Sequence, residues 1–252
     1  MAQLKLVDPD HSTLDLDAVN SALAEASPEA TLEWAGGTFG DRMIVTSSFG
    51  ADSAVMLHLM SRVLPKVPVV FLDTGYLFPE TYRFAEELTA RLKVDVRVYS
   101  PLLTAARQEA LHGKLWEGDA RALERYHQIN KVEPMDRALR ELAPLAWIAG
   151  LRAKQNRYRA GLRKVELQDG VYKVHPILAW DDEEVHRYLR ANDLPYHPLR
   201  KLGYRSIGDV HSTFPTEQGE DPRAGRRLGE HTECGIHLPR TAQDESLKSS
   251  GL

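Results

Sequence analysis

The chain has 252 residues and a single cysteine, Cys234, within the run Glu233-Cys234-Gly235-Ile236-His237-Leu238. A lone thiol forms no disulfide within its own chain and cannot hold a four-cysteine metal or iron–sulfur site. Its chemistry would be that of a nucleophile, and the alternative is an inert, buried thiol. Cationic neighbours lower the pKa of a thiol and favour the reactive thiolate. The basic residues around this cysteine are Arg226, Arg227, His231 and His237.

Two short loops have the composition of an anion site. The first is Ser47-Ser48-Phe49-Gly50-Ala51-Asp52-Ser53, between an expected strand and an expected helix. Its backbone N–H groups lie next to a helix N-terminus, which favours anions. The second, Asp73-Thr74-Gly75, follows Leu72 at the end of the next expected strand and borders the same crevice. Each also fits an ordinary turn, and neither matches the Walker A or Gly-x-Gly-x-x-Gly pattern.

Basic residues follow the elements expected further along the chain. Lys131 precedes Val132-Glu133-Pro134, and Arg152, Lys154 and Arg157 follow the strand expected at 145–151. The planar guanidinium matches the oxygens of a phosphate. A solvated helix face is the alternative for several of these charges. Their position after a strand end favours anion binding for Lys131, Arg152 and Arg157.

The composition excludes several classes of protein. A net charge of −4 gives no general attraction to nucleic acid, and no apolar run reaches the roughly 20 residues that cross a bilayer. Residues 1–10 lack the pattern of a signal peptide. The spacing of His197 and His211 matches no zinc motif, so no metal site is expected. One unpaired cysteine fits a reducing compartment, which predicts a cytoplasmic location.

Helical and strand periodicities alternate along the chain and predict a parallel sheet with helices on both faces. From Leu194 onward the periodicity disappears, and we expect a loop-rich tail that carries Cys234. Gly36-Gly37 is expected to end the first helix, and Gly113 to break the fourth. The expected elements are strands at 43–46, 67–72, 94–99 and 145–151, helices at 12–35, 54–64, 79–93, 102–126, 133–142 and 181–192, and a hairpin of 164–167 with 171–174.

Seven segments, taken in order, resemble the phosphoadenylyl-sulfate (PAPS) reductase family. The resemblance covers the chain from the loop at 47–53 to Leu238, and the order of the segments makes it specific. The segments are Ser47-Ser48-Phe49-Gly50, Leu72-Asp73-Thr74-Gly75-Tyr76-Leu77-Phe78-Pro79-Glu80-Thr81-Tyr82, Lys131-Val132-Glu133-Pro134, Gly150-Leu151-Arg152, His175-Pro176-Ile177, Gly203-Tyr204-Arg205-Ser206-Ile207-Gly208-Asp209 and Glu233-Cys234-Gly235-Ile236-His237.

The resemblance implies an adenine-nucleotide α-hydrolase-like fold, related to the ATP pyrophosphatases. It implies a nucleotide-binding α/β domain at 1–193 and a tail at 194–252 with the catalytic cysteine. The implied reaction reduces PAPS to sulfite and adenosine 3′,5′-bisphosphate through a sulfonate on Cys234, which thioredoxin resolves. His237 is the second implied catalytic residue. The implied substrate-binding residues are Ser47, Ser48, Phe49, Gly50, Asp52, Ser53, Leu72, Asp73, Thr74, Gly75, Lys131, Arg152, Arg157, Gly203, Tyr204, Arg226 and Arg227.

The resemblance also bears on cofactors and partners. We expect no bound cofactor and no iron–sulfur cluster, thioredoxin or glutaredoxin as electron donor, a homodimer, and no nucleic-acid or membrane partner. A cluster-free reductase of adenylyl sulfate (APS) stays open as an alternative. So do an ATP-pyrophosphatase-type adenylating enzyme and a nucleotide-binding module without chemistry. Ser48 and Phe49 stand where the ATP enzymes carry two glycines, which counts against ATP cleavage.

Overall fold

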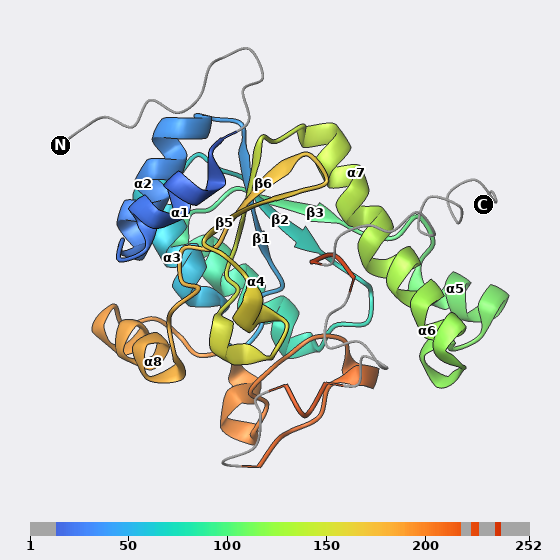
Figure 1. The fold of residues 1–252 in the computed structure, drawn as a ribbon. Helices are drawn as coiled ribbons and strands as arrows, with labels where there is room; N and C mark the ends of the chain where they lie inside the picture. The colour runs from blue at the N-terminus through green and yellow to red at the C-terminus, as the bar shows by residue number, and fades with distance from the viewer. Residues whose placement is uncertain (1–13, 218–222, 227–234, 238–252) are drawn as a thin grey trace.

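A computed structural model of the chain describes residues 14–217, 223–226 and 235–237. Its centre is a six-stranded sheet in the order β3-β2-β1-β4-β6-β5, with helices on both faces (Figure 1). Neighbouring strands are parallel, except that β5 and β6 are antiparallel. The predicted α/β fold with a parallel sheet is confirmed. The strands are β1 (Met43–Ser47), β2 (Val69–Leu72), β3 (Val96–Tyr99), β4 (Ala146–Ala149), β5 (Val165–Gln168) and β6 (Val171–Val174).

The two faces of the sheet bury separate hydrophobic cores, because successive side chains of a strand point to opposite faces. Val45 and Val69 belong to one core, whereas Ile44 and Val70 belong to the other. Burial on both faces explains why these strands are apolar runs in the sequence. The second core is covered by α7 (Glu133–Leu142). The first is covered by α1 (Leu16–Leu23), α2 (Pro28–Phe39), α3 (Ser53–Val63), α4 (Pro79–Leu92) and α8 (Asp182–Ala191).

The single helix expected at 12–35 is wrong, because the structure has two helices there. Pro28 lacks an N–H group and would clash inside a longer helix, but it fits the first position of a new one. Ser27 caps that new helix, since its Oγ accepts a hydrogen bond from the Ala30 N–H at 3.1 Å. Gly36 and Gly37, expected to end a helix, lie inside α2.

The helix expected at 102–126 is also divided further than predicted. It consists of α5 (Ala105–His112), the 3₁₀ turn η1 (Leu115–Glu117) and α6 (Ala120–His127). The break at Gly113 is confirmed, and Asp119 starts α6 by accepting a hydrogen bond from the Ala122 N–H. A π-helical turn, η2 (Gln128–Val132), then joins α6 to α7. The β5–β6 hairpin is confirmed: Asp169 and Gly170 both have positive φ, as a tight hairpin turn requires.

Residues 194–217 contain two short 3₁₀ turns, η5 (Pro198–Leu202) and η6 (Val210–Ser212), and lie across one end of the sheet (Figure 1, orange). They are attached through Leu199 and Ile207, which pack with Ala51 of the loop after β1. The division of the chain at residues 193 and 194 stays a prediction. Within the described residues, no helix combines the length and the apolar character needed to span a membrane.

Candidate active site

The cavity that could hold a ligand lies where the strand order changes direction. The chain passes from β1 to β2 and β3 on one side, and β4 and β6 lie on the other side of β1. In such sheets the crevice at the carboxyl ends of the two central strands binds ligands. A cavity of about 260 Å³ lies there, lined by residues of the loop after β1, of the segment after β4 and of 205–209.

The loop after β1 turns its one large side chain away from this cavity. Phe49 has a φ of 46° and is fully buried, with its ring edge-on to Phe71 at 4.8 Å between centroids. Ser47 Oγ accepts a hydrogen bond from the Phe49 N–H, which stabilises the turn. Ser48 and Gly50 line the cavity instead. The small residues therefore face the ligand space, while Phe49 anchors the loop in the core.

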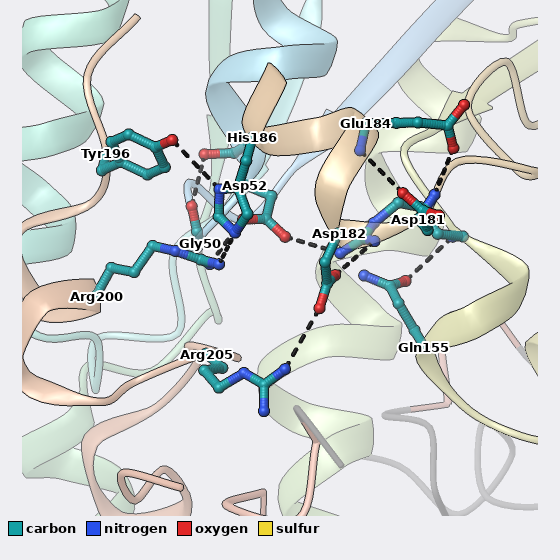
Figure 2. Close-up of polar contacts among 12 residues, drawn as sticks. Gly50, Asp52, Gln155, Asp181, Asp182, Glu184, His186, Tyr196, Arg200 and Arg205 are labelled. Atoms are coloured by element: carbon teal, nitrogen blue, oxygen red, sulfur yellow. Dashed lines mark hydrogen bonds and ion pairs between the residues drawn. The ribbon is translucent and has the colours of Figure 1, made fainter. Parts of the chain in front are cut away.

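Asp52 stands at the N-terminus of α3, but its side chain makes no capping hydrogen bond. Its carboxylate instead accepts from Arg152 Nη2 and from Arg200 Nη1, each at 2.9 Å. Asp182 continues the chain of charges, with Arg152 Nη1 at 2.8 Å and Arg205 Nη2 at 3.3 Å. Figure 2 shows Asp52 and Arg200 together on one side and Asp182 and Arg205 on the other. We call these five residues the Asp52 network.

The Asp52 network holds its arginines in place and offsets much of their charge. Arg152 is only 3% exposed, and both of its terminal nitrogens contact a carboxylate. Burial would raise the pKa of Asp182, but Arg152, Arg205 and Arg200 outweigh burial and hold that pKa below its usual value. The network thus joins the loop after β1 to the segment after β4, to α8 and to residues 200–205. Three guanidinium groups against two carboxylates leave it one positive charge.

A second buried ion pair closes the opposite side of the cavity. Lys131 Nζ lies 2.6 Å from Asp209 Oδ2, and the Thr74 hydroxyl donates to Asp209 Oδ1 at 2.6 Å. Lys131 belongs to the π-helical turn η2, a geometry that often marks functional sites. Asp209 is fully buried. Burial alone would raise its pKa, but Lys131 and Thr74 hold it far below the usual value, so Asp209 is ionised at neutral pH.

Residues 235–237 dock against the same side. Ile236 packs on the second core, and His237 stacks on the Trp147 ring at 5.3 Å between centroids. Gly235 has a φ of 87°, a conformation that favours glycine, and lies beside Val132. Burial first, and then the charge of Lys173, lower the pKa of His237 well below its usual value. His237 is therefore neutral at physiological pH.

The basic side chains of the cavity outnumber the acidic ones. Seven basic residues and three carboxylates are among its described lining residues, a difference of four positive charges. Arg226 is held over Gly208, whose missing side chain leaves room for the guanidinium, and its Nη1 donates to Ser206 Oγ at 3.3 Å. Such a cavity fits a ligand with several anionic groups. The basic residues are Lys131, Arg152, Arg159, Arg200, Arg205, Arg223 and Arg226.

The structure brings many of the predicted site residues to this cavity. Those that line it are Ser47, Ser48, Gly50, Asp52, Ser53, Leu72, Thr74, Lys131, Arg152, Arg226 and His237. Those described but not lining it are Phe49, Asp73, Gly75, Arg157, Gly203 and Tyr204. Two predicted residues, Cys234 and Arg227, lie outside the described residues.

The residues that do not line the cavity have other contacts. Asp73 accepts hydrogen bonds from the Gly75 N–H and the Tyr82 hydroxyl. Tyr204 packs edge-on to Phe78 at 5.6 Å, and Gly203 ends η5 with a φ of 88°. Arg157 is exposed.

The sequence analysis missed several lining residues. Arg159 lies two positions after Arg157, in the segment that follows β4, and is buried. Arg205 stands within a segment of the family resemblance, so its position was a usable signal. Arg200 and Asp182 line the cavity and are held there by the Asp52 network, a contact that their positions in the sequence do not indicate.

Comparisons with known proteins agree on one family. The family model described as "Phosphoadenosine phosphosulfate reductase domain" matches residues 42–215. A phosphoadenosine 5′-phosphosulfate reductase of Synechocystis sp. is 48% identical over 95% of this chain and 97% of its own length. One of Alkalilimnicola ehrlichii is 50% identical over 88% of this chain and 91% of its own.

Solved structures give the same result. The phosphoadenylyl-sulfate (PAPS) reductase of Candida auris, in a phosphate complex, has a TM-score of 0.72 and 34% identity, covering 81% of this chain and 99% of its own. The FMN adenylyltransferase of Candida glabrata has a TM-score of 0.57 and 17% identity, covering 96% of this chain and 85% of its own. At that identity the second likeness concerns the fold alone, which is the adenine-nucleotide α-hydrolase-like fold expected from the sequence.

Proposed function

Because the chain belongs to the phosphoadenosine phosphosulfate reductase family and is an oxidoreductase that reduces PAPS in sulfate assimilation, we propose that Cys234 is the nucleophile of the reaction. The observation that carries this proposal is the position of Ile236 and His237, which follow Cys234 in the sequence and line the cavity. The thiol is the only one in the chain.

The proposed reaction has three steps. In the first, the Cys234 thiolate attacks the sulfur of the sulfate group, and an S–Sγ bond forms as the S–O bond to the phosphate breaks. Adenosine 3′,5′-bisphosphate leaves with the electron pair, as an anion that needs little acid catalysis. In the second, a thiolate of the reductant attacks Cys234 Sγ and releases sulfite. The second thiol of the reductant then resolves the mixed disulfide and restores Cys234, so one dithiol supplies both electrons.

The cavity's positive charge supports the first step. A thiolate that approaches a dianionic phosphosulfate meets repulsion, and preorganised cations reduce it. Lys131 and Arg226 lie on the side of the cavity where residues 235–237 dock, and we propose that they bind the phosphosulfate. We propose that the small residues of the loop after β1, with Thr74 and the Asp52 network, hold the rest of the nucleotide in position.

The substrate-binding role extends to residues that frame the cavity. Phe49 fixes the loop after β1 in the core, and Asp73 fixes the turn after β2 through the Gly75 N–H. Gly203 and Tyr204 support the segment that ends at Asp209. We propose that these residues act through the backbone they position.

We further propose that thioredoxin or glutaredoxin supplies the dithiol, that the enzyme holds no iron–sulfur cluster, and that it acts in the cytoplasm as a homodimer. A chain with one cysteine cannot supply four thiolate ligands, and a free catalytic thiol requires a reducing compartment. Light scattering on the full chain measures its oligomeric state. Sulfite release by each reductant at equal concentration ranks the two donors.

Intact-protein mass spectrometry tests the nucleophile. The reduced enzyme is mixed with PAPS, and separately with APS, in the absence of reductant. We expect a sulfonate adduct with PAPS that maps to Cys234 and is released as sulfite when thioredoxin is added. The Cys234→Ser variant should give no adduct and no turnover, whereas an ATP-dependent adenylating enzyme would keep its activity. A wild-type enzyme that turns over PAPS without any adduct would overturn the proposed mechanism.

A further inference from the structure

His237 is held by residues from three parts of the chain. Its ring stacks on Trp147 of β4, with an angle of 29° between the planes. Its Nδ1 lies 3.2 Å from Nζ of Lys173, a residue of β6. The Tyr158 hydroxyl donates to its backbone carbonyl at 2.9 Å. These contacts fix both the position and the ring orientation of His237, which is the third residue after Cys234.

Lys173 is an unusual neighbour for a histidine ring. It is 2% exposed, although it carries an ammonium group. Nζ contacts Gln168 Oε1 at 2.8 Å as well as His237 Nδ1, and it lies 4.2 Å from the centre of the Trp147 ring. An amide oxygen, an imidazole nitrogen and an aromatic face all act as acceptors for a cation. The surroundings of Nζ thus suit a charged donor.

This contact decides which nitrogen of His237 carries the proton. An ammonium group donates and cannot accept, so Nδ1 must offer its lone pair to Lys173. In a neutral imidazole the proton then resides on Nε2. Among the residues that the structure describes, Arg159, His175 and Arg223 also act on the ring, and each of them disfavours a second proton. Glu166 Oε2 lies 3.7 Å from Nε2 of His175.

We propose that Lys173 is a positioning residue that fixes His237 as the tautomer with its proton on Nε2, so that the ring gives one neutral N–H donor to the sulfate oxygens of the substrate. The inference rests on the proposed function, in which Cys234 and the residues after it act in this cavity. The other tautomer would present a lone pair to anionic oxygens and repel them. A neutral donor also stabilises the transition state without supplying a proton that would quench the thiolate.

Nitrogen NMR of the full chain tests the tautomer without reference to activity. The protein is labelled with ¹⁵N at its histidine rings, and the signals of His237 are assigned by their loss in the His237→Gln variant. We expect Nε2 to be protonated and Nδ1 unprotonated in the wild type at pH 7. A wild-type ring protonated on Nδ1, or on both nitrogens, would overturn the proposal. This readout needs no variant of Lys173.

Substitution of Lys173 tests its role. In Lys173→Met, Nδ1 loses its donor, so we expect a mixture of tautomers or a protonated ring. Lys173→Arg keeps a donor that cannot accept, so the wild-type tautomer should persist. Lys164→Met is the matched control, because Lys164 precedes β5 and its Nζ bonds the backbone carbonyls of Leu23 and Ala26. An unchanged tautomer in Lys173→Met would refute the positioning role.

The rate of Cys234 sulfonation gives a second readout. We expect Lys173→Met to slow single-turnover sulfonation in proportion to the fraction of His237 that leaves the wild-type tautomer, up to the roughly 100-fold that loss of one transition-state donor costs, with little change in substrate affinity. Because the pKa of His237 rises once Lys173 is gone, a loss of activity on the acidic side should enter the pH profile. Lys173→Arg should restore the wild-type profile. If no protein, wild type included, forms a sulfonate, the proposed function fails, while the NMR result still decides the tautomer.

Discussion

The two sides of the cavity use their charges differently. In the Asp52 network, three arginines share two carboxylates. The nitrogen–oxygen distances of their four ion pairs lie between 2.8 and 3.3 Å. On the opposite side, Asp209 pairs with Lys131, and Arg226 bonds Ser206 Oγ. The first side is thus a chain of linked ion pairs from several segments, whereas the second centres on one buried ion pair.

This difference separates structural from electrostatic work. Arg152 joins two carboxylates that come from different segments, so its main effect is to hold the cavity's wall together. The opposite side combines the buried Lys131–Asp209 pair with the neutral His237, the third residue after Cys234. We infer that the second side stabilises the charge of the transferred sulfate, and that the first side keeps the nucleotide's frame rigid.

The largest effect is expected from Asp209→Asn, which keeps the side chain's shape but removes its charge. Lys131 would then be a buried cation without its carboxylate, which costs about 3–5 kcal/mol in the free energy of unfolding. The folded-state pKa of Asp209 is depressed, so its contribution is present above the usual value near 4 and is lost as the pH falls below it. Urea unfolding from about pH 7 to about pH 3 measures both effects.

Asp95→Asn is the control for this variant. Asp95 pairs with Arg97 at 2.8 Å, but both side chains are about half exposed, and exposed pairs contribute about 0–1 kcal/mol. If Asp209→Asn costs no more than Asp95→Asn, or if the difference from wild type does not shrink in acid, the Lys131–Asp209 pair is not the anchor of its side of the cavity.

Arg152→Met tests the structural side. Asp52 keeps Arg200 and Asp182 keeps Arg205, and both carboxylates are partly exposed, so we expect a moderate loss of about 1.5–3 kcal/mol. Binding of adenosine 3′,5′-bisphosphate should weaken as the wall loosens. Arg157→Met is the matched control from the same segment, since Arg157 is exposed and does not line the cavity. Titration calorimetry measures the affinity of both variants for adenosine 3′,5′-bisphosphate. If Arg157→Met lost as much affinity as Arg152→Met, Arg157 would belong to the site.

The fold was largely predictable because its central strands, β1, β2 and β4, are largely buried on both faces. The runs at 43–45 and Ala146–Ala149 are apolar, so their identity as buried strands follows from composition alone. The errors fall where one residue overrides periodicity. Pro28 starts a new helix inside an apparently continuous pattern, and Asp119 starts α6 after a 3₁₀ turn.

The candidate site was predictable only in part, because the role of a basic side chain depends on which residues it contacts in the fold. The loop at 47–53 and Lys131 follow expected elements, so their place at the cavity could be anticipated. Asp52 contacts Arg152, which is 100 residues away in the sequence, and Arg200, which is 148 residues away. No local sequence pattern predicts such contacts. The role of Lys173 is hidden in the sequence, since a lysine within a strand is ordinarily read as a solvent-facing residue.

The smallest effect is expected from Gly235→Ala, which tests how tightly residues 235–237 are positioned. Gly235 has a φ of 87°, and a Cβ there would meet Val132 Cγ2 at 3.4 Å, so backbone strain outweighs crowding. Such strain costs about 1–3 kcal/mol. Gly113→Ala carries similar strain, at a φ of 69° with open space around it, at the end of α5. Both variants should therefore lose similar stability in thermal unfolding, but only Gly235→Ala should slow Cys234 sulfonation. Equal sulfonation rates would mean that the backbone at Gly235 does not set the approach of the nucleophile, and the proposed link between the docking of His237 and catalysis would lose its structural basis.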